Sequence, residues 1–327
     1  MQNFEYMAPT AVITAAQALS DKWGVTETLM GGTDTSSLLK ERLTKPTRVV
    51  SLGNIAELKG VSKAGRGVRI GSMTSLSKLM MNKSVVAAYP SIVQAIDGIN
   101  SMQHRAMSTV ASDLLQRPRC WYFRNGFGLL GMQNGKSLIP MGENKYHAIL
   151  GNKGPAYFVS ASSLAPALIA LGAQATLVGP EGSRKISVEE LYHIPSNENE
   201  RETTIKPNEV LSEVVIPAVG ANSTYEIRER SLFDWPLATA SVSLEIKGGT
   251  VQEAMVVMGH VAPKPWRSSE AENALKGKKV SEAVAMEAGK AAVSAATPLS
   301  DNKHKVQLAS VAVKRAVMLA SGMKVPA

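Results

Sequence analysis

Over the first 60 residues, segments with apolar residues at helical spacing alternate with short segments that have the pattern of a strand. Thr10 to Leu19 and Ser36 to Arg42 have apolar residues at helical spacing. Glu27 to Met30 and Arg48 to Leu52 are short extended runs, and a further strand is expected before the first helix. Strands that alternate with helices predict a small parallel α/β unit.

A second region begins near Gly67, where the apolar run Gly67 to Ser72 predicts a strand. A long stretch from Gln116 to Gly151 then has little periodicity and is rich in Gly, Arg and aromatic residues. Loops of this length in compact proteins usually carry function or bind a partner. The other expected elements are helices Ser75 to Met81, Val85 to Ile99 and Ser163 to Leu171, strands Ala156 to Ser160 and Ala175 to Val178, and a polar loop from Glu198 to Glu213.

A third region begins near Ala221. Leu237 to Ile246 and Val251 to Gly259 alternate apolar and polar residues, and Lys247 to Thr250 joins them as a hairpin turn. Val280 to Ala296 and Lys305 to Ser321 have helical spacing. A chain of 327 residues exceeds the usual size of one core. We therefore predict three units, 1–60, 61–220 with an irregular arm at 116–151, and 221–327.

The net charge of +9 raises the question of nucleic-acid binding. Residues 259–327 hold 11 Lys or Arg against 5 Asp or Glu, so most of the excess is C-terminal. These charges are spread along helical patterns without clustered aromatic residues, which make up only 5% of the chain. The pattern favours a solvated face or a docking surface for an acidic partner over a nucleic-acid site.

The chain has no run of 18 apolar residues, so no membrane span is expected. Its first residues show neither a basic nor an apolar leader pattern, which predicts a cytoplasmic protein, or a periplasmic one only if a partner exports it. Cys120 is the one cysteine. A single thiol excludes a disulfide within the chain and any metal site that needs several thiolates.

The sharpest local motif is Leu29 to Thr35, which follows a strand and opens a helix. Gly31 and Gly32 allow a tight turn, and the residues after them leave backbone N–H groups at a helix start, which suits a pyrophosphate. The motif is not the G-x-G-x-x-G fingerprint. An ordinary strand-to-helix turn capped by Thr33 or Asp34 has the same sequence, so both interpretations stay open.

Side chains for direct bond-breaking chemistry are sparse. The five histidines show no metal-ligand spacing, and no G-x-S-x-G motif is present. Cys120 lies between Arg119 and Arg124 in a run with three aromatic residues. Flanking arginines would make the thiol reactive, whereas burial beside the aromatic rings would make it inert. Chemistry in this chain is therefore expected to belong to a bound cofactor.

Together these features resemble the FAD-binding medium subunit of the molybdenum hydroxylases, the xanthine dehydrogenase and carbon monoxide dehydrogenase family. The resemblance covers nearly the whole chain and depends on seven segments in matching order. They are Met30 to Asp34 with Pro46 and Val50, Gly67 to Ser72 with Thr74, Ser101 to Arg105, Leu164 to Leu168, Asn208 to Leu211, Arg228 to Ala238, and Gly259 to Arg267.

Two segments of the arm, Leu115 to Arg124 and Gly142 to Gly151, are most similar to the flavoprotein subunit of aldehyde oxidoreductases. In those relatives the arm carries further cysteines that hold a 4Fe-4S cluster. Here only Cys120 is present, and such a cluster needs about four thiolates. We therefore expect no 4Fe-4S cluster in this chain.

The resemblance implies an α+β, PCMH-type FAD-binding fold. It combines a small parallel α/β subdomain, a larger antiparallel-sheet subdomain, and a C-terminal domain with a three-stranded sheet and helices. FAD would lie between the first two subdomains. The residues that the resemblance places at the cofactor are Leu29, Met30, Gly31, Gly32, Thr33, Asp34 and Thr35 at the pyrophosphate, Ser108, Thr109, Ser112 and Asp113 near the ribityl or flavin, Leu211 against a ring, and Arg228 as a nearby positive charge.

The chain departs from the family in one cofactor segment. Relatives commonly read T-[IV]-G-G-N where this chain reads Thr109-Val110-Ala111-Ser112-Asp113. Ala and Ser add Cβ atoms, and Asp replaces a neutral amide with a carboxylate. A carboxylate would repel a pyrophosphate, although it could accept a hydrogen bond from a ribityl hydroxyl.

The resemblance implies an oxidoreductase subunit of a heterotrimer. FAD in this chain would take electrons from 2Fe-2S clusters on a small partner, which receive them from molybdopterin on a large partner. The acceptor would be NAD, oxygen, a quinone or a protein. The alternatives are a structural subunit of the same assembly that has lost the flavin, and a stand-alone protein that binds nucleic acid or another anion.

Overall fold

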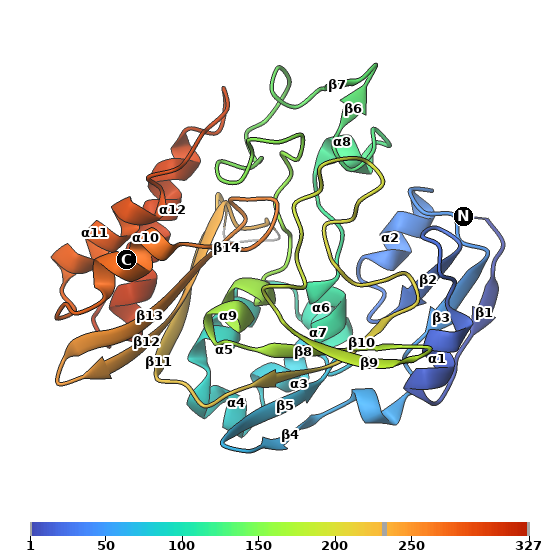
Figure 1. The fold of residues 1–327 in the computed structure, drawn as a ribbon, viewed down its shortest axis with the longest axis horizontal. Helices are drawn as coiled ribbons and strands as arrows, with labels where there is room; N and C mark the ends of the chain where they lie inside the picture. Colours follow the sequence, from blue (N-terminus) through green and yellow to red (C-terminus); the bar gives the residue numbers. More distant parts are fainter. Residues whose placement is uncertain (1, 231–233, 326–327) are drawn as a thin grey trace.

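The computed structural model describes residues 2–230 and 234–325. Three sheets follow one another along the chain and lie side by side across the molecule (Figure 1). An arm rises above the second sheet, between the first unit and the C-terminal domain, and carries only short elements (Figure 1). Its helix and strands are α8 (Trp121–Arg124), β6 (Met132–Gln133) and β7 (Lys136–Ser137).

The first sheet is parallel with strand order β1-β3-β2, as the alternating pattern predicts. Helix α1 packs on it through Ala15 and Ala16, which are fully buried beside Val50. Small side chains let this short helix approach the sheet closely. The elements are β1 (Glu5–Met7), α1 (Val12–Ala18), β2 (Thr26–Leu29), α2 (Thr35–Lys40), β3 (Arg48–Ser51) and the 3-10 turn η1 (Ala56–Leu58).

The second sheet is antiparallel with order β4-β5-β10-β8-β9. Its core side chains pack against five of the six helices of this region in one continuous cluster. The strands are β4 (Val61–Ala64), β5 (Gly67–Gly71), β8 (Gln174–Gly179), β9 (Gly182–Ser187) and β10 (Val210–Ile216). The helices are α3 (Leu76–Met80), α4 (Lys83–Ala88), α5 (Pro90–Asp97), α6 (Met102–Met107), α7 (Val110–Leu114) and α9 (Leu164–Ala170).

Two expected elements of this region differ in the structure. The helix expected over Val85 to Ile99 is two helices, because Pro90 starts α5 and Tyr89 before it has φ −132° and ψ 60°. The residue before a proline is disfavoured in the helical region. The strand expected over Ala156 to Ser160 is absent, and this segment forms single backbone hydrogen bonds such as Ser160 N to Ala262 O at 2.9 Å.

The third sheet is antiparallel with order β11-β12-β13-β14, and α12 packs against β11 and β12. Three strands are long, as expected, and a two-residue fourth strand extends the sheet. The elements are β11 (Ala221–Ile227), β12 (Ala238–Lys247), β13 (Thr250–Gly259), β14 (Trp266–Arg267), α10 (Ser269–Leu275), α11 (Glu282–Ala292) and α12 (His304–Ala320). The predicted α+β fold class is thus confirmed.

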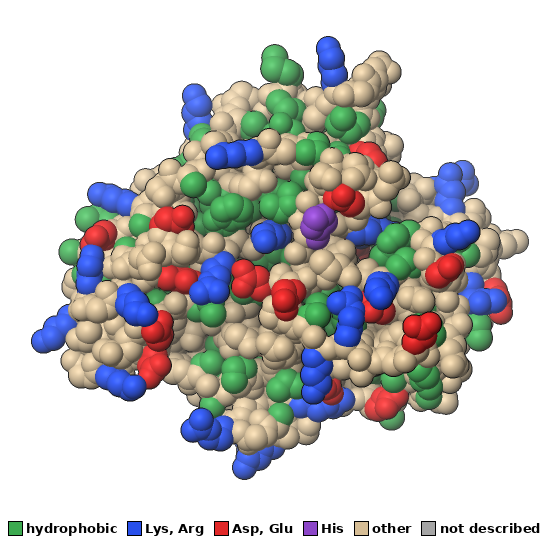
Figure 2. Space-filling model, in the orientation of Figure 1, with side chains coloured by type: hydrophobic (Ala, Val, Ile, Leu, Met, Phe, Trp, Pro, Cys, Tyr) green, Lys and Arg blue, Asp and Glu red, His purple; other side chains and the backbone are tan. Residues whose placement is uncertain are grey.

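Surface charge does not form a single-sign field on the face drawn in Figure 2. Lys and Arg side chains there are interspersed with Asp and Glu over the lower part of the molecule (Figure 2). Nonspecific nucleic-acid binding depends on concentrated positive charge. This face therefore gives no support to a nucleic-acid interface. No helix within the described chain is both long and apolar enough to cross a membrane.

The packing of α11 on α12 depends on Gly289. A Cβ built at this position would lie 2.3 Å from the Ser310 carbonyl oxygen. We expect Gly289→Ala to destabilise the protein by about 1–3 kcal/mol through this overlap, although alanine is the better helix former. Urea unfolding measures the loss, with Lys290→Ala on the exposed side of the same helix as the control. Equal unfolding midpoints for the two variants would contradict this packing.

Candidate functional site

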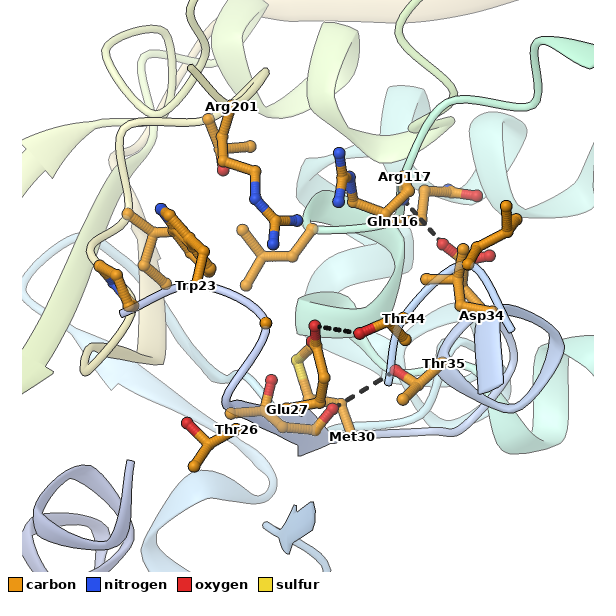
Figure 3. Close-up of a pocket in the computed structure, with 18 of the residues that line it drawn as sticks. Trp23, Thr26, Glu27, Met30, Asp34, Thr35, Thr44, Gln116, Arg117 and Arg201 are labelled. Carbon is orange, nitrogen blue, oxygen red and sulfur yellow. Dashed lines mark hydrogen bonds between the residues drawn. The ribbon is translucent and has the colours of Figure 1, made fainter. Parts of the chain in front are cut away.

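One cavity opens between the first unit and the base of the arm, and we call it the loop cavity. It has a volume of about 480 Å³, within the usual range for a small-molecule site. Three parts of the chain line it: residues 19–45 of the first unit, the end of α7 with the arm base, and the segment 201–209 (Figure 3).

The turn Met30 to Thr35 forms one edge of this cavity. Within the described part of the chain, no atom accepts a hydrogen bond from the backbone N–H groups of residues 31–35. Successive free N–H groups in a turn are suited to bind an anion. Gly32 has φ +73°, a conformation that glycine adopts without strain.

Gly31 is required by the protein itself. A Cβ at this position would lie 2.2 Å from the Met107 carbonyl oxygen and 3.1 Å from Ser108 Cα. The turn therefore lies directly on the backbone before α7, and Thr33 Oγ1 is 3.5 Å from Ser108 Oγ. This contact brings the two predicted cofactor segments together.

Asp34 connects the turn to the arm. Its side chain is only 8% exposed, and it accepts hydrogen bonds from Arg117 N at 2.7 Å and Arg124 Nη2 at 2.9 Å. Arg119 Nη1 is 3.1 Å away. One carboxylate thus faces two guanidinium groups, so the local charge is positive and Asp34 does not present a free negative charge to the cavity.

Asp113 does not face the loop cavity. Its Oδ1 accepts hydrogen bonds from Leu164 N at 3.0 Å and Ser162 Oγ at 2.5 Å, so it caps the start of α9 from outside that helix. Burial raises the pKa of this carboxyl, against the lowering effect of these hydrogen bonds. The sequence suggested that the Asp113 carboxylate would repel a pyrophosphate. In the structure this carboxylate points away from the loop cavity, so it does not oppose an anion there.

Ser112 also turns its hydroxyl toward the protein. It accepts a hydrogen bond from Thr109 N at 2.7 Å, while Thr109 Oγ1 accepts one from Ser112 N at 3.2 Å, which closes a capping box at the start of α7. Ser108 Oγ lies 3.0 Å from Ser112 Oγ. Ser112 thus stabilises the start of α7.

The structure places the predicted site residues in three locations. Leu211 is 1% exposed and packs in the core of the second sheet, where its side chain lines neither the loop cavity nor the arm cavity. Asp113 and Arg228 line a separate cavity of about 210 Å³. The predicted residues that line the loop cavity are Met30, Gly32, Asp34, Thr35 and Ser112. The others lie next to these, in the same turn or in the segment that contacts the turn, and are Leu29, Gly31, Thr33, Ser108 and Thr109.

Sequence reasoning missed Arg201, whose guanidinium reaches into the loop cavity together with that of Arg117 (Figure 3). Arg201 lies over the Trp23 ring at 4.1 Å and forms no ion pair with any carboxylate of the described residues. Burial, and then the charge of Arg117, lower the pKa of Arg201 to about 10, which keeps it charged at neutral pH. No local sequence signal connects Trp23 with Arg201, which are far apart along the chain.

A second cavity, of about 270 Å³, lies between the arm and the C-terminal domain, and we call it the arm cavity. Cys120 and His147 both line it, with Sγ and Nε2 3.2 Å apart. Burial raises the pKa of the Cys120 thiol and lowers that of His147 to about 4. The pair is therefore a neutral thiol beside a neutral imidazole, which agrees with the inert alternative for Cys120. Within the described chain no three His, Cys, Asp or Glu side chains form a metal-binding group.

Lys305 is the buried charge of the arm cavity, with 1% of its surface exposed. Its Nζ donates to the carbonyl oxygens of Tyr146 at 3.1 Å, His147 at 3.0 Å and His260 at 2.7 Å. These contacts use all three donors of the ammonium group. Burial and then the charge of Lys305 lower the pKa of His260 to about 3.

Replacing the Asp34 carboxylate should loosen the base of the arm. We expect Asp34→Asn to cost about 2 kcal/mol or more, because two largely buried guanidinium groups lose their counterion. Hydrogen exchange should rise first at residues 117–125. Asp97→Asn is the control, since Asp97 is 72% exposed and pairs with Arg105 at the surface. Unchanged exchange in the Asp34 variant would show that the arm is held elsewhere.

The two buried histidines should make the protein acid-labile. Both stay neutral in the folded state down to pH about 4, whereas histidine in the unfolded chain binds a proton near pH 6.5. Stability is then fully present above pH 6.5 and falls below it, by roughly 2–3 kcal/mol at pH 5.5 for the pair. Urea unfolding at pH 7.5 and 5.5 checks this, and His260→Gln should reduce the difference. A midpoint that does not move with pH would refute it.

Both parts of the chain match known families. The FAD binding domain in molybdopterin dehydrogenase matches residues 2–219, and the CO dehydrogenase flavoprotein C-terminal domain matches residues 223–320. The carbon monoxide dehydrogenase medium chain of Hydrogenophaga pseudoflava is 26% identical over 96% of both chains. The aldehyde oxidoreductase FAD-binding subunit PaoB of Escherichia coli is 28% identical over 73% of this chain and 76% of that one.

Solved structures agree on the fold. The carbon monoxide dehydrogenase of Hydrogenophaga pseudoflava superposes with a TM-score of 0.77 over 98% of both chains at 24% identity. The expected resemblance is thus confirmed over nearly the whole chain. The protein belongs to the family of FAD-binding medium subunits of molybdenum-dependent hydroxylases and dehydrogenases, which are subunits of oxidoreductase complexes.

Proposed function

We propose that the loop cavity holds FAD, and that the chain passes electrons from iron–sulfur clusters on a partner to an external acceptor. The observation that carries the site is the row of unpartnered N–H groups at residues 31–35, on the edge of a cavity into which an unpaired arginine also points. Both features suit a pyrophosphate, which is anionic and accepts several hydrogen bonds.

The residues of the cavity fit this cofactor. Gly31 fixes the turn against Met107, and Gly32 provides the left-handed turn that leaves the N–H groups free. Arg201 supplies positive charge. Thr35 Oγ1 donates to the Thr28 carbonyl oxygen at 3.3 Å and so fixes the start of α2. Bound FAD would supply the redox chemistry, while these residues bind and orient it and compensate its charge.

We further propose that the chain works with a large molybdopterin subunit and a small 2Fe-2S subunit. The name of one relative, a dehydrogenase medium chain, supports this proposal because a medium chain implies other chains in the same complex. NAD, oxygen, a quinone and a protein all remain candidate acceptors. The cytoplasmic location, the absence of a 4Fe-4S cluster and the domain boundaries stay predictions from the sequence. A flavin-less structural subunit is the alternative function.

FAD content separates the two functions. We expect the purified complex to release close to one FAD per chain on acid extraction, and Gly32→Asp to lose most of it, because the new carboxylate meets the pyrophosphate position. Gly65→Asp is the matched control, since Gly65 also has positive φ (+58°) but lies in the β4–β5 turn with open space around it. Only traces of FAD in the unmodified complex would support the structural subunit. Equal FAD in both variants would refute the assigned turn.

A further inference from the structure

The arm cavity is separate from the loop cavity, and no residue lines both. Residues at the base of the arm form the wall between them. Gln116, Arg117 and Phe123 face the loop cavity. Arg119, Cys120 and Trp121 face the arm cavity. A ligand of the arm cavity would therefore not occupy the loop cavity, where we propose that FAD binds.

Aromatic rings surround the arm cavity. Tyr146 and Trp235 are 40% and 38% exposed, which is unusual for such large rings, and Phe158 is buried at 1%. Trp121 meets Tyr146 edge to face, with 5.7 Å between ring centroids. Partly exposed rings that converge on one cavity favour a planar, aromatic ligand, because ring contacts are worth more than their buried area alone.

The charge around the arm cavity is positive and not balanced by the protein. Lys305 is buried with only neutral carbonyl partners, and it forms no ion pair with a described carboxylate. Arg119 shares the single carboxylate of Asp34 with Arg124. A buried cation without a counterion is costly, and burial lowers the pKa of Lys305 to about 7. An anion bound nearby would therefore stabilise the protonated form of Lys305.

The acidic residues of the cavity are already paired. Glu229 accepts a hydrogen bond from Lys145 at 2.8 Å, and Asp234 pairs with Arg230 at 2.9 Å. Neither acid neutralises Lys305.

We propose that the arm cavity binds a small aromatic carboxylate, a single ring that carries one anionic group. The ring would lie among Trp121, Tyr146 and Trp235, and the carboxylate would face the positive charge of Lys305 and Arg119. The site shares no residue with the loop cavity, and it shares Asp234 and Trp235 with the cavity of about 210 Å³ that Asp113 and Arg228 line.

Isothermal titration calorimetry of the purified protein, in its complex, tests both parts of the ligand with three probes. Benzoate should bind saturably. Benzamide, which has the ring without the charge, should bind at least about tenfold more weakly, because it lacks the negative charge that Lys305 and Arg119 attract. Acetate, which has the charge without the ring, should give no saturable heat. Absence of benzoate binding, or equal affinity for benzamide, would overturn the proposal.

Two tryptophans provide a matched pair of variants. Trp235 and Trp23 are 38% and 39% exposed, and an arginine lies over each ring, but they line different cavities. Trp235→Ala should weaken benzoate binding about tenfold through loss of the ring contact. Trp23→Ala should leave benzoate binding unchanged. An equal effect of both variants would place benzoate elsewhere in the complex and contradict the proposed site.

If the Trp235→Ala variant does not fold, a measurement on the unmodified chain tests the benzoate site instead. Cys120 is the only cysteine and lines the arm cavity. Saturating benzoate should slow its alkylation by iodoacetamide several-fold, whereas acetate at the same concentration should not. Mass spectrometry of the peptide that contains Cys120 follows the rate, and equal rates with both salts would reject the site.

Discussion

The arm depends on two buried charges that hold its ends. At its start, Asp34 binds the backbone of Arg117 and the side chains of Arg119 and Arg124. At its end, Lys305 binds the carbonyl oxygens of Tyr146 and His147. A segment with so little regular structure cannot be ordered by its own hydrogen bonds, so its position must come from contacts of this kind. Each contact is strong because it lies largely out of water.

This arrangement makes the arm base a wall between two cavities of different character. The side facing the first unit has free N–H groups and arginines, which suits a phosphate-bearing cofactor. The side facing the C-terminal domain has aromatic rings around an unbalanced positive charge. Asp34 connects them, because the residue that starts α2 also fixes the orientation of Arg119. A substitution at Asp34 should therefore change the position of side chains in both cavities.

Periodicity in the sequence predicted most helices and strands, since apolar spacing reports which face is buried. Pro90 is a helix-breaking residue that the sequence shows directly. The prediction of one helix across it was wrong because the apolar spacing continues on both sides of Pro90. The segment Ala156 to Ser160 has the composition of a strand, yet within the described chain its backbone bonds only to Ala148 and Ala262, which lie outside the strands, so no ladder forms. Partners distant in the sequence, such as Trp23 with Arg201, could not be found because no local pattern connects them.

The segment Ala111-Ser112-Asp113 shows how a substitution in a cofactor motif can be absorbed by the fold. Ala111 is fully buried, and its N–H donates to the Ser72 carbonyl oxygen at 2.8 Å. Ser112 caps its own helix, and Asp113 caps α9. All three side chains are thus used by the protein, where the sequence alone suggested that they would meet the cofactor. In the site that we propose, anion binding therefore depends on the turn at residues 31–35 and on Arg201. The residues proposed to bind FAD then come from the first unit and the segment 201–209 more than from α7.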